Sequence, residues 1–400
     1  MECVVLAAGE GKRMRPLTAS RPKVMLPIAN RPMIEYLIAA TRDAGIDRFV
    51  LVVGYREKEI RSYFGDGSAL GVSIRYATQR RQLGTGDAVR SVRDLVSGRF
   101  LLLNGDMLLS AADCRALGEA DAPCMGIFRS DHPQQYGVVT VSDGRVTGLV
   151  EKSPNPPSSL INAGAYVFNQ DIFDLVDAIG LSERGEYELT DALMAYIRKG
   201  TLSARTLSSW CDVGEPWSLL DANETMLADL ETRIDGEVEE GVTIHGPVVV
   251  GKGSVVRAGT YITGPCVIGE DCVIGPHAFI RGSTAIGDGC HIGHATEIKN
   301  SIVFEGTKIP HFNYVGDSVI GSGCNFGAGT KIANLRHDRG IVRACGRETG
   351  RKKFGAVIGD GVQFGINCSV NTGSVVGSNV RVAPHSLVEG CISDGTVIGR

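Results

Sequence analysis

The chain lacks several features that would assign it to a special class of protein. None of its 11 cysteines forms a CxxC pair, no apolar run reaches the roughly 18 residues that a membrane-spanning helix needs, and the formal net charge is only −4. Cysteines scattered in this way are expected to pack as small, reduced, apolar side chains, so neither a disulfide framework nor a zinc site is predicted. The weak charge gives no reason to expect a nucleic acid or a membrane surface as partner.

The length of the chain and its first residues narrow the class further. A chain of 400 residues favours two or three domains, each large enough for a sizeable core. The N-terminal sequence MECVVLAAG enters an apolar strand without a charged leader and a cleavable apolar segment. The cytoplasm is therefore the expected location.

A repeat of six residues fills the second half of the chain. From Val238 onward an aliphatic or aromatic residue recurs at every sixth position, usually before Gly; the period slips by one at Val303 and at Ile320, and a gap spans residues 335–356. This period suits very short strands joined by tight turns in a parallel β-helix of hexapeptide repeats. Each coil can bury its apolar position only against neighbouring coils, which explains why the tract is long.

The first half alternates short apolar runs with helical stretches, which predicts an α/β domain with a mainly parallel sheet and a mixed extension. The predicted strands are residues 3–9, 48–54, 73–78, 99–106, 122–129, 138–141 and 163–168, and the predicted helices are residues 32–44, 86–95 and 215–231. The last helix would lead into the repeats, so we expect domains at residues 1–231 and 232–400.

A glycine-containing loop, GEGKRM at residues 9–14, follows the first predicted strand. Met14 stands where a dinucleotide fingerprint has its third glycine, and Arg13 stands where a Walker A loop has Ser or Thr. The loop nevertheless lies at the carboxyl end of the first strand, where open α/β sheets bind ligands. Arg13, Arg15 and Lys23 add cations nearby, so the segment predicts a polyphosphate site built from backbone N–H groups and cations.

The segment LAAGEGKRMRPLTASRPKVMLPIANRPMIEY, residues 6–36, resembles the signature of the sugar-1-phosphate nucleotidylyltransferases. Further motifs follow in the order of that family, namely QLGTGDA (82–88), NGD (104–106), YGVV (136–139), EK (151–152), NAGAY (162–166) and WCDVGEPW (210–217). The resemblance implies a Rossmann-like nucleotidyltransferase domain with a GT-A-like mixed sheet. In the family's reaction a sugar-1-phosphate oxygen attacks the α-phosphorus of a nucleoside triphosphate and pyrophosphate leaves.

The same resemblance implies the residues of this site. Asp106 and Asp212 match two carboxylates that hold Mg²⁺, a hard ion that prefers oxygen ligands. Arg13 matches the arginine that neutralises the triphosphate, and Lys23 the lysine that contacts the sugar phosphate and the α-phosphate. The nucleotide-binding surface is matched by Ala7, Ala8, Gly9, Gly11, Arg13, Gln79, Gln82, Gly84 and Thr85, and the sugar pocket by Gly137, Glu151, Lys152 and Asn162. Such a base-reading surface would accept uracil or thymine alike, so both UTP and dTTP are expected substrates.

Within the repeats, KIPHFNYVGDSVIGSGCNFGAGTKIAN (308–334) resembles the acetyltransferase site of the bifunctional enzymes that make UDP-N-acetylglucosamine. That resemblance implies a left-handed β-helix, acetyl-CoA as donor and His311 as general base. It also implies sugar and sugar-phosphate contacts from Arg281, Lys299, Tyr314, Asn325, Asn334 and Lys353, and acetyl-CoA contacts from Ala328 and Ala383. The chemistry is coherent, because acyl transfer to an amine needs a base near neutral pH, oxyanion donors from Gly-rich turns and cations for a phosphate.

Two readings apply to the interruption at residues 335–356, which is rich in Arg and Lys. It is either a solvated excursion or a basic flap over an anionic ligand, and we favour the flap. A role in binding nucleic acid is not expected, since the segment lacks interleaved aromatic residues.

Resemblance to the archaeal type of bifunctional sugar-1-phosphate nucleotidylyltransferase/acetyltransferase covers essentially the whole chain. Leu335 departs from the bacterial acetyltransferases, which have Tyr there, and Asp212 lies in a DVG motif where the bacterial uridylyltransferases use Asn. The resemblance implies N-acetylation of glucosamine-1-phosphate, or of a close epimer, and UMP or dTMP transfer to N-acetylglucosamine-1-phosphate. The alternatives are a single-activity glucose-1-phosphate thymidylyltransferase or mannose-1-phosphate guanylyltransferase with a structural tail, and a silent sensor of nucleotide sugars.

A homotrimer is also expected. Hexapeptide acyltransferases resemble one another in placing the active site between subunits of a symmetric trimer. The predicted acetyltransferase residues Arg281, Lys299, His311, Asn325 and Lys353 are spread over several coils, and we expect that they lie too far apart along the axis for all of them to meet on a single face.

Overall fold

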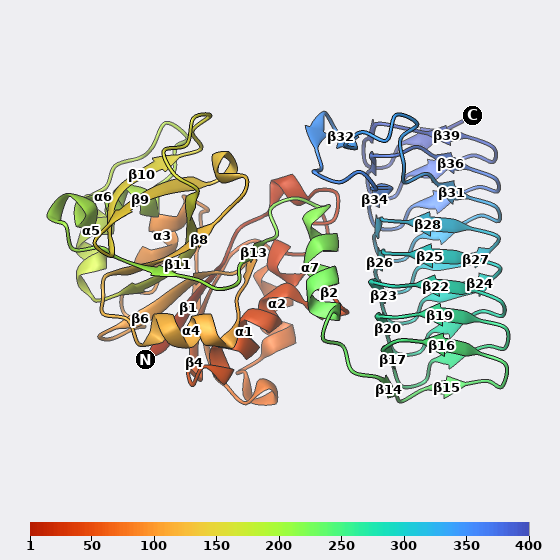
Figure 1. Ribbon diagram of the computed structural model, residues 1–400, viewed down its shortest axis with the longest axis horizontal. Coiled ribbons are helices and arrows are strands. Elements are labelled where there is room, and N and C mark those ends of the chain that lie inside the picture. The colour runs from red at the N-terminus through yellow and green to blue at the C-terminus, as the bar shows by residue number, and fades with distance from the viewer. Residues whose placement is uncertain (400) are drawn as a thin grey trace. The chain divides into compact units, whose positions relative to one another are not determined.

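The computed structural model describes residues 1–399, and within it the chain forms two compact units (Figure 1). The first comprises Met1–Glu10, Pro22–Met25 and Met33–Asp212, and the second comprises Gly11–Arg21, Leu26–Pro32 and the chain from Val213 onward. No helix among residues 1–399 is long and apolar enough to cross a membrane.

A nine-stranded mixed sheet forms the centre of the first unit, in the order β5-β4-β1-β6-β11-β8-β12-β10-β9. Its strands are β1 (Glu2–Ala7), β4 (Arg48–Val53), β5 (Ser73–Thr78), β6 (Phe100–Asn104), β8 (Cys124–Arg129), β9 (Gly137–Ser142), β10 (Arg145–Glu151), β11 (Leu160–Phe168) and β12 (Ser203–Thr206). The strands from β5 to β6 are parallel, whereas β11 runs antiparallel to β6 and β8. This arrangement confirms the parallel sheet with a mixed extension.

Helices cover both faces of that sheet. The elements are α1 (Met33–Asp43), α2 (Glu57–Phe64), α3 (Thr85–Arg90), α4 (Ala111–Gly118), α5 (Asp171–Ala178) and α6 (Leu189–Lys199), with the short turns η2 (Lys23–Met25), η3 (Ser68–Leu70) and η4 (Pro133–Gln135). Alternate residues of β1 enter opposite cores: Cys3 and Val5 pack with α1, and Val4 packs with α3 and α5. Successive side chains of a strand point to opposite faces of the sheet. A strand that is buried on both faces therefore needs apolar residues at consecutive positions, as β1 has.

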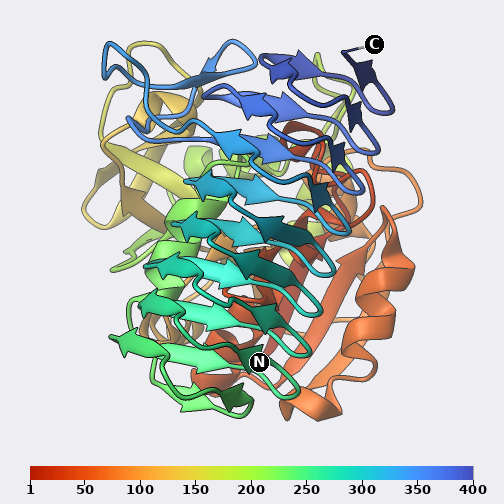
Figure 2. The same ribbon diagram turned by 90° about the vertical axis from the view of Figure 1, so that its right-hand side faces the viewer.

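Three parallel sheets of very short strands form most of the second unit, and their coils stack in register (Figures 1 and 2). The β14 sheet contains β14 (Arg233–Ile234), β17 (Val248–Val250), β20 (Cys266–Ile268), β23 (Thr284–Ile286), β26 (Ile302–Val303), β29 (Val319–Ile320), β34 (Ala356–Ile358), β37 (Ser374–Val376) and β40 (Cys391–Ile392). The β15 sheet contains β15 (Glu237–Val238), β18 (Val255–Val256), β21 (Val273–Ile274), β24 (His291–His294), β27 (Lys308–His311), β30 (Asn325–Phe326), β35 (Gln363–Phe364), β38 (Arg381–Val382) and β41 (Val397–Ile398). The β16 sheet contains β16 (Thr243–His245), β19 (Tyr261–Thr263), β22 (Phe279–Arg281), β25 (Glu297–Lys299), β28 (Tyr314–Gly316), β31 (Lys331–Ile332), β36 (Ser369–Val370) and β39 (Leu387–Val388).

The six-residue register forms the interior of this β-helix. Its members, from Val250 through Ile298 to Val388, are buried in one continuous core. Ile268 pairs with Ile286, and Ile286 pairs with Val303, one residue earlier than the repeat would give. The slips are therefore shortened corners that leave the stacked interior intact. The β-helix of hexapeptide repeats is confirmed.

The remaining elements of the second unit lie outside the coils. They are η1 (Lys12–Met14), β2 (Pro27–Ile28), β3 (Arg31–Pro32), α7 (Ser218–Leu227) and a hairpin of β32 (Arg343–Ala344) and β33 (Arg347–Glu348) in the interruption. The helix predicted at 215–231 is thus shorter at both ends. In the first unit β7 (Met107–Leu108) pairs with β13 (Cys211–Asp212).

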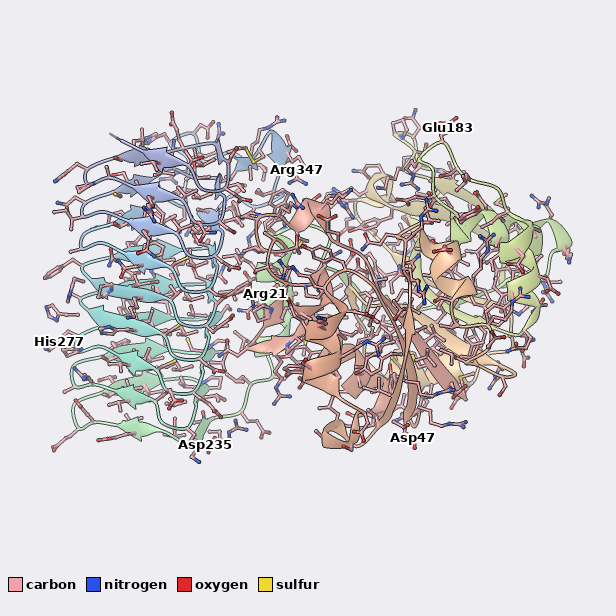
Figure 3. All side chains as sticks on the ribbon, turned by 180° about the vertical axis from the view of Figure 1, so that it is seen from behind. Arg21, Asp47, Glu183, Asp235, His277 and Arg347 are labelled. Atoms are coloured by element: carbon pink, nitrogen blue, oxygen red, sulfur yellow. A yellow bond between two sulfur atoms is a disulfide. The ribbon has the colours of Figure 1, made fainter. Side chains whose placement is uncertain are left out.

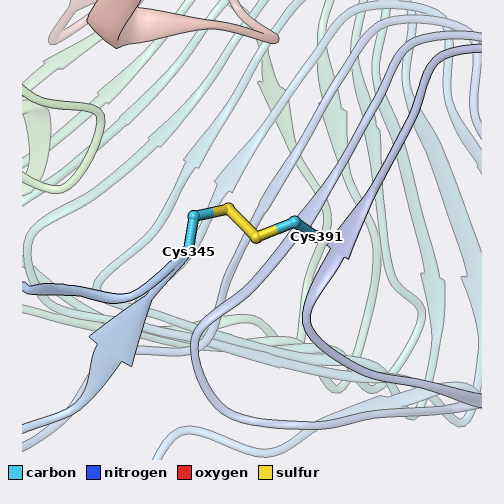
Figure 4. The surroundings of a disulfide bond; sticks show 2 residues. All are labelled: Cys345 and Cys391. Carbon is cyan, nitrogen blue, oxygen red and sulfur yellow. A yellow bond between two sulfur atoms is a disulfide. The ribbon is translucent and has the colours of Figure 1, made fainter.

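One expectation about the cysteines is wrong. Cys345 of the hairpin and Cys391 of β40 form a disulfide (Figure 4). The other nine are free and, apart from Cys211, buried, as expected for small apolar side chains. The interruption folds back toward the end of the β-helix, and this approach cannot be read from the spacing of the two cysteines.

Candidate active sites

In the first unit the structure brings Asp106 and Asp212 to neighbouring strands. Asp106 follows β6 and directly precedes β7, and Met107 of β7 is the cross-strand partner of Asp212. Lys23 lies 2.5 Å from Asp106 (Nζ to Oδ2), and its side chain is almost buried. Two carboxylates and a lysine therefore gather near the carboxyl end of β6.

Gly105 explains why the NGD motif has glycine before this aspartate. A Cβ atom at Gly105 would lie 2.7 Å from the carbonyl oxygen of Leu6 in β1. The Gly105 amide also donates to that oxygen at 2.9 Å. Only glycine permits this close approach, which places Asp106 beside the end of β1, where the predicted nucleotide loop begins.

The residues predicted to bind the nucleotide lie on three segments. Ala7 ends β1, and Ala8 and Gly9 follow it, while the Gln82 side chain donates to the Ala8 carbonyl at 3.0 Å. The Gln79 amide nitrogen donates to Gly84 O (3.0 Å) and to Asp87 (2.9 Å). The Gln79 side chain is thus hydrogen-bonded to the segment that follows it in the chain.

The segment after Gln82 is fixed by close backbone packing. Gly84 has φ +98°, and a Cβ there would lie 2.6 Å from the Tyr187 carbonyl. Thr85 opens α3, and its hydroxyl accepts the Leu189 amide at 3.0 Å. These contacts hold the loop of Gln82, Gly84 and Thr85 against the segment before α6.

Gly11 and Arg13 belong to the second unit. Gly11 is left-handed (φ +68°) and opens η1, and the exposed Arg13 guanidinium lies 3.7 Å from Glu215. The other oxygen of Glu215 pairs with Arg347, labelled in Figure 3. Glu215, from the DVGEPW motif, is thus shared by the signature loop and the interruption.

The same loop contacts two corners of the β-helix. Arg21, labelled in Figure 3, is paired with Glu305 at 2.8 Å and lies over the Phe304 ring, and Ser20 is hydrogen-bonded to Asp360. Burial opposes ionisation of Glu305, but hydrogen bonds and charge from Arg21, together with Ser322, lower the pKa of this carboxyl. Sequence reasoning missed this anchor.

The predicted sugar residues of the first unit also lie together. Gly137 of β9 and Glu151 of β10 are cross-strand partners, and Lys152 follows in a left-handed conformation (φ 42°). Asn162 lies on β11, which pairs with β9, and accepts the Tyr166 hydroxyl at 2.9 Å. Burial raises the pKa of Glu151, and Lys152 opposes this shift.

In the second unit a polar cluster lies on the β16 sheet. Arg281 and Lys299 occupy aligned positions of β22 and β25, and Gly316 of β28 continues the column. Asn334 donates to the Tyr314 hydroxyl at 3.1 Å, and a Cβ at Gly316 would lie only 2.6 Å from that hydroxyl. Parallel pairing puts Arg281 and Lys299 on adjacent strands, so these two of the five predicted residues share a face.

Two carboxylates complete this cluster, and sequence reasoning missed both. Arg281 pairs with Glu297 at 2.8 Å, and Lys299 pairs with Asp317 at 3.0 Å. Asp317 also accepts hydrogen bonds from Asn300 (2.9 Å) and Asn334. The only signal in the sequence is an Asp in the turn after the YVG strand.

His311 and Asn325 lie on the β15 sheet instead. His311 is exposed at the end of β27, one short turn before Tyr314, and Asn325 opens β30. Ala328 O accepts the Asn367 amide, and the Ala383 amide donates to Ile398 O. Lys353 is exposed, and its backbone forms an isolated antiparallel β-bridge with Leu335. The predicted acetyltransferase residues therefore occupy two sheets of the β-helix.

Most arginines of the interruption are paired with carboxylates, so its basic charge is more neutralised than its composition indicates. Its ion pairs are Arg336–Asp338, Arg343–Glu348, Arg347–Glu215, Arg351–Asp221 and Arg351–Glu224. A basic flap would therefore depend on Arg339, Lys352 and Lys353.

Comparison with known proteins bears on both units. Residues 2–229 match the family described as Nucleotidyl transferase, residues 262–349 the GMPPB C-terminal domain, and residues 355–390 the bacterial transferase hexapeptide (six repeats). A solved Bacillus anthracis structure, described as a glucose-1-phosphate thymidylyltransferase with sucrose, is 27% identical with a TM-score of 0.53, covering 58% of this chain and 97% of its own. These matches define a nucleotidyltransferase joined to a hexapeptide-repeat transferase.

Relatives along the whole chain identify the family. The Bifunctional protein GlmU of Methanococcus maripaludis strain C7 is 41% identical, covering 100% of this chain and 97% of its own. The bifunctional sugar-1-phosphate nucleotidylyltransferase/acetyltransferase of Sulfurisphaera tokodaii is 37% identical, covering 97% of each. The chain belongs to this GlmU-type family of archaeal bifunctional sugar-1-phosphate nucleotidylyltransferases/acetyltransferases.

Proposed function

We propose that the chain makes UDP-N-acetylglucosamine, or its dTDP equivalent, in two steps. The β-helix acetylates glucosamine-1-phosphate with acetyl-CoA, and the nucleotidyltransferase domain transfers UMP or dTMP to N-acetylglucosamine-1-phosphate with release of pyrophosphate. The observation that carries the proposal is the pair of clusters, Lys23–Asp106 with Asp212 in one unit and Lys299–Asp317 with Asn334 in the other. The proposed domains are residues 1–231 and 232–400, and the proposed β-helix is left-handed.

The residues at the end of β6 fit a magnesium ion. Asp106 and Asp212 supply hard oxygen donors from neighbouring strands, and residues 1–399 contain no cluster of three or more candidate metal-binding side chains. Two carboxylates suffice, because Mg²⁺ retains waters and completes its shell with substrate phosphates. When bound, the ion would neutralise charge on the transferring phosphoryl group.

The chain's own residues would position the reactants. Lys23 is held by Asp106 and keeps two further N–H donors for a phosphate, and Arg13 would neutralise the triphosphate. Phosphoryl transfer depends mainly on such positioning and charge stabilisation. Gly137, Glu151, Lys152 and Asn162 would hold the sugar.

Acetyl transfer would use His311 as the base. Its imidazole takes a proton from the ammonium group of the sugar, and the free amine attacks the thioester carbonyl. As the C–N bond forms and the C–S bond breaks, the second proton of the nitrogen passes to the leaving thiolate, which departs as the thiol. Because His311 and Asn325 lie on a different sheet from Arg281 and Lys299, a homotrimer would unite residues of different subunits in one site. A monomer with full acetyl transfer in light scattering would contradict this part.

The alternative is a single-activity thymidylyltransferase with a structural β-helix, which the similarity to the Bacillus anthracis structure favours over 58% of the chain. One assay separates the two: protein with glucosamine-1-phosphate, acetyl-CoA, UTP and Mg²⁺, with thiol and pyrophosphate followed separately. Thiol release supports the bifunctional enzyme, and pyrophosphate formed from a ready-made sugar-1-phosphate, without thiol release, supports the alternative.

Base choice gives a further prediction. A pyrimidine pocket should accept both UTP and dTTP, since one methyl group is worth only about 1–3 kcal/mol, and should exclude the larger ATP and GTP. Pyrophosphate release with each of the four triphosphates measures this preference. Efficient turnover of GTP would contradict it.

A further inference from the structure

Asp317 is the most buried ionised group of the polar cluster on the β-helix. Only 3% of its side chain is exposed, compared with 18% for its partner Lys299. A carboxylate removed from water to this degree is costly unless it is fully paired. Its oxygens accept from three side chains, and two of these, Lys299 and Asn334, are the proposed sugar-phosphate contacts.

The two carboxylate oxygens of Asp317 accept hydrogen bonds from different side chains. Oδ1 accepts the Asn300 amide at 2.9 Å, and Oδ2 accepts Lys299 Nζ at 3.0 Å and the Asn334 amide. Asn334 in turn donates to the Tyr314 hydroxyl at 3.1 Å. A lysine ammonium has three N–H donors, so one bond to Asp317 fixes its direction and leaves two donors for a ligand.

We propose that Asp317 is a positioning residue for acetyl transfer: it holds the Lys299 ammonium and the Asn334 amide in the orientation that receives the phosphate and hydroxyl groups of the amino-sugar phosphate. The inference rests on the proposed function of the β-helix. It adds Asp317, which contacts Lys299 and Asn334 and not the sugar phosphate itself. Three residues from three successive coils, Lys299, Asp317 and Asn334, are thereby fixed as one unit.

A purely structural role for Asp317 is the competing explanation. Its backbone is left-handed (φ 50°), and Asn and Asp adopt that conformation more readily than most residues. Asn300 occupies the equivalent corner one coil earlier, with φ 44°. Because the fold already accommodates asparagine at this corner, Asp317→Asn keeps the turn and the acceptor for Asn300. It replaces only the oxygen that faces Lys299 and Asn334 with a donor.

The network also extends beyond the cluster. Asn300 donates to Glu224 of α7 at 2.9 Å, and Glu224 accepts from Arg351 of the interruption at 2.6 Å. Asp317→Asn leaves these contacts in place, since they depend on the Asn300 amide and not on Oδ2. The Asp317 charge also acts on Arg351 through space, but the only hydrogen bonds that the substitution removes in the described residues are those from the two proposed ligand contacts.

The test compares wild type, Asp317→Asn and Asp271→Asn in the full-length chain. Asp271 is the matched control, an exposed aspartate with the same left-handed backbone (φ 53°). Thiol release is measured against glucosamine-1-phosphate and against acetyl-CoA, and thermal unfolding is recorded for each protein. For Asp317→Asn we expect KM for the sugar phosphate to rise about 10-fold or more, as for the loss of a hydrogen bond to a charged group. We expect KM for acetyl-CoA and pyrophosphate release to stay within about 3-fold of wild type.

The outcomes separate this inference from the proposed function. A normal KM for the sugar phosphate in Asp317→Asn, with wild type active, overturns the positioning role and leaves acetyl transfer standing. An equal rise for Asp271→Asn, or a parallel rise for acetyl-CoA, also overturns it, because either would show a general loosening of the coils. No thiol release from wild type with amino-sugar phosphates overturns both proposals together.

Discussion

Each unit pairs a lysine with an aspartate, but the two pairs differ in exposure. Asp106 has 33% of its side chain exposed, whereas Asp317 has 3%. The first carboxylate is accessible to an ion from solvent, as the proposed magnesium site requires. The second is enclosed, so its bond to Lys299 is a fixed part of the fold. The same residue pair is thus partly open to solvent in one unit and enclosed in the other.

Asp106→Ala and Asp212→Ala should have the largest effects. Removing a proposed ligand of Mg²⁺ costs several kcal/mol of transition-state stabilisation, so we expect pyrophosphate release to fall by about 10³-fold or more. Thiol release should remain near wild type, since it depends on residues of the other unit. Asp174→Ala, at an exposed helix position, is the control. Loss of both activities in a folded Asp106 variant would show that the two sites depend on each other.

His311→Ala should have the reverse specificity. Loss of a general base typically costs about 10²–10⁴-fold, so we expect that decrease in thiol release with unchanged pyrophosphate release. His337→Ala, on the exposed interruption, should behave as wild type. If His311→Ala keeps its full rate, another group takes the proton.

Glu305 should give the smallest effect, seen in stability at low pH. Its pKa is lowered in the folded state, so its contribution is complete above the pKa of the unfolded chain, about 4.3, and is lost as the pH falls through the folded value. The Glu305 side chain is 53% exposed, so the contribution should be less than about 1 kcal/mol. As the pH falls, the free energy of unfolding measured in urea should decrease slightly more for wild type than for Glu305→Gln. Identical slopes would show that the Arg21 contact is energetically neutral.

Elements with a strong apolar period could be predicted from the sequence. The strand predicted at 73–78 is found at those residues, and the six-residue register forms the core of the β-helix. Helix α2 was missed because its sequence, EKEIRSYF, buries only Ile60 and Phe64. Strand β12 was missed because Ser203–Thr206 has no buried residue.

The residues of the two sites were predictable only where they match a family motif. Asp106 and Lys23 lie in such motifs, and the structure does bring them together. Asp317 was missed because its role depends on partners one coil before and one coil after it, which no local pattern reveals. The Arg21–Glu305 pair joins residues 284 positions apart in the chain, and its existence depends on the tertiary fold.

The disulfide has a consequence for the free end of the β-helix. A solenoid is a one-dimensional array, and its last coil has a neighbour on one side only, so unfolding is expected to begin there. Cys391 lies in one of the last strands, and its bond to Cys345 closes a covalent ring that contains the coils from β34 to β40. Strand β40, which contains Cys391, therefore cannot separate from the coil before it without moving the Cys345 hairpin with it, whereas β41 follows Cys391 and lies outside the ring. The disulfide therefore tethers the C-terminal coils of a β-helix that has no capping helix in residues 392–399.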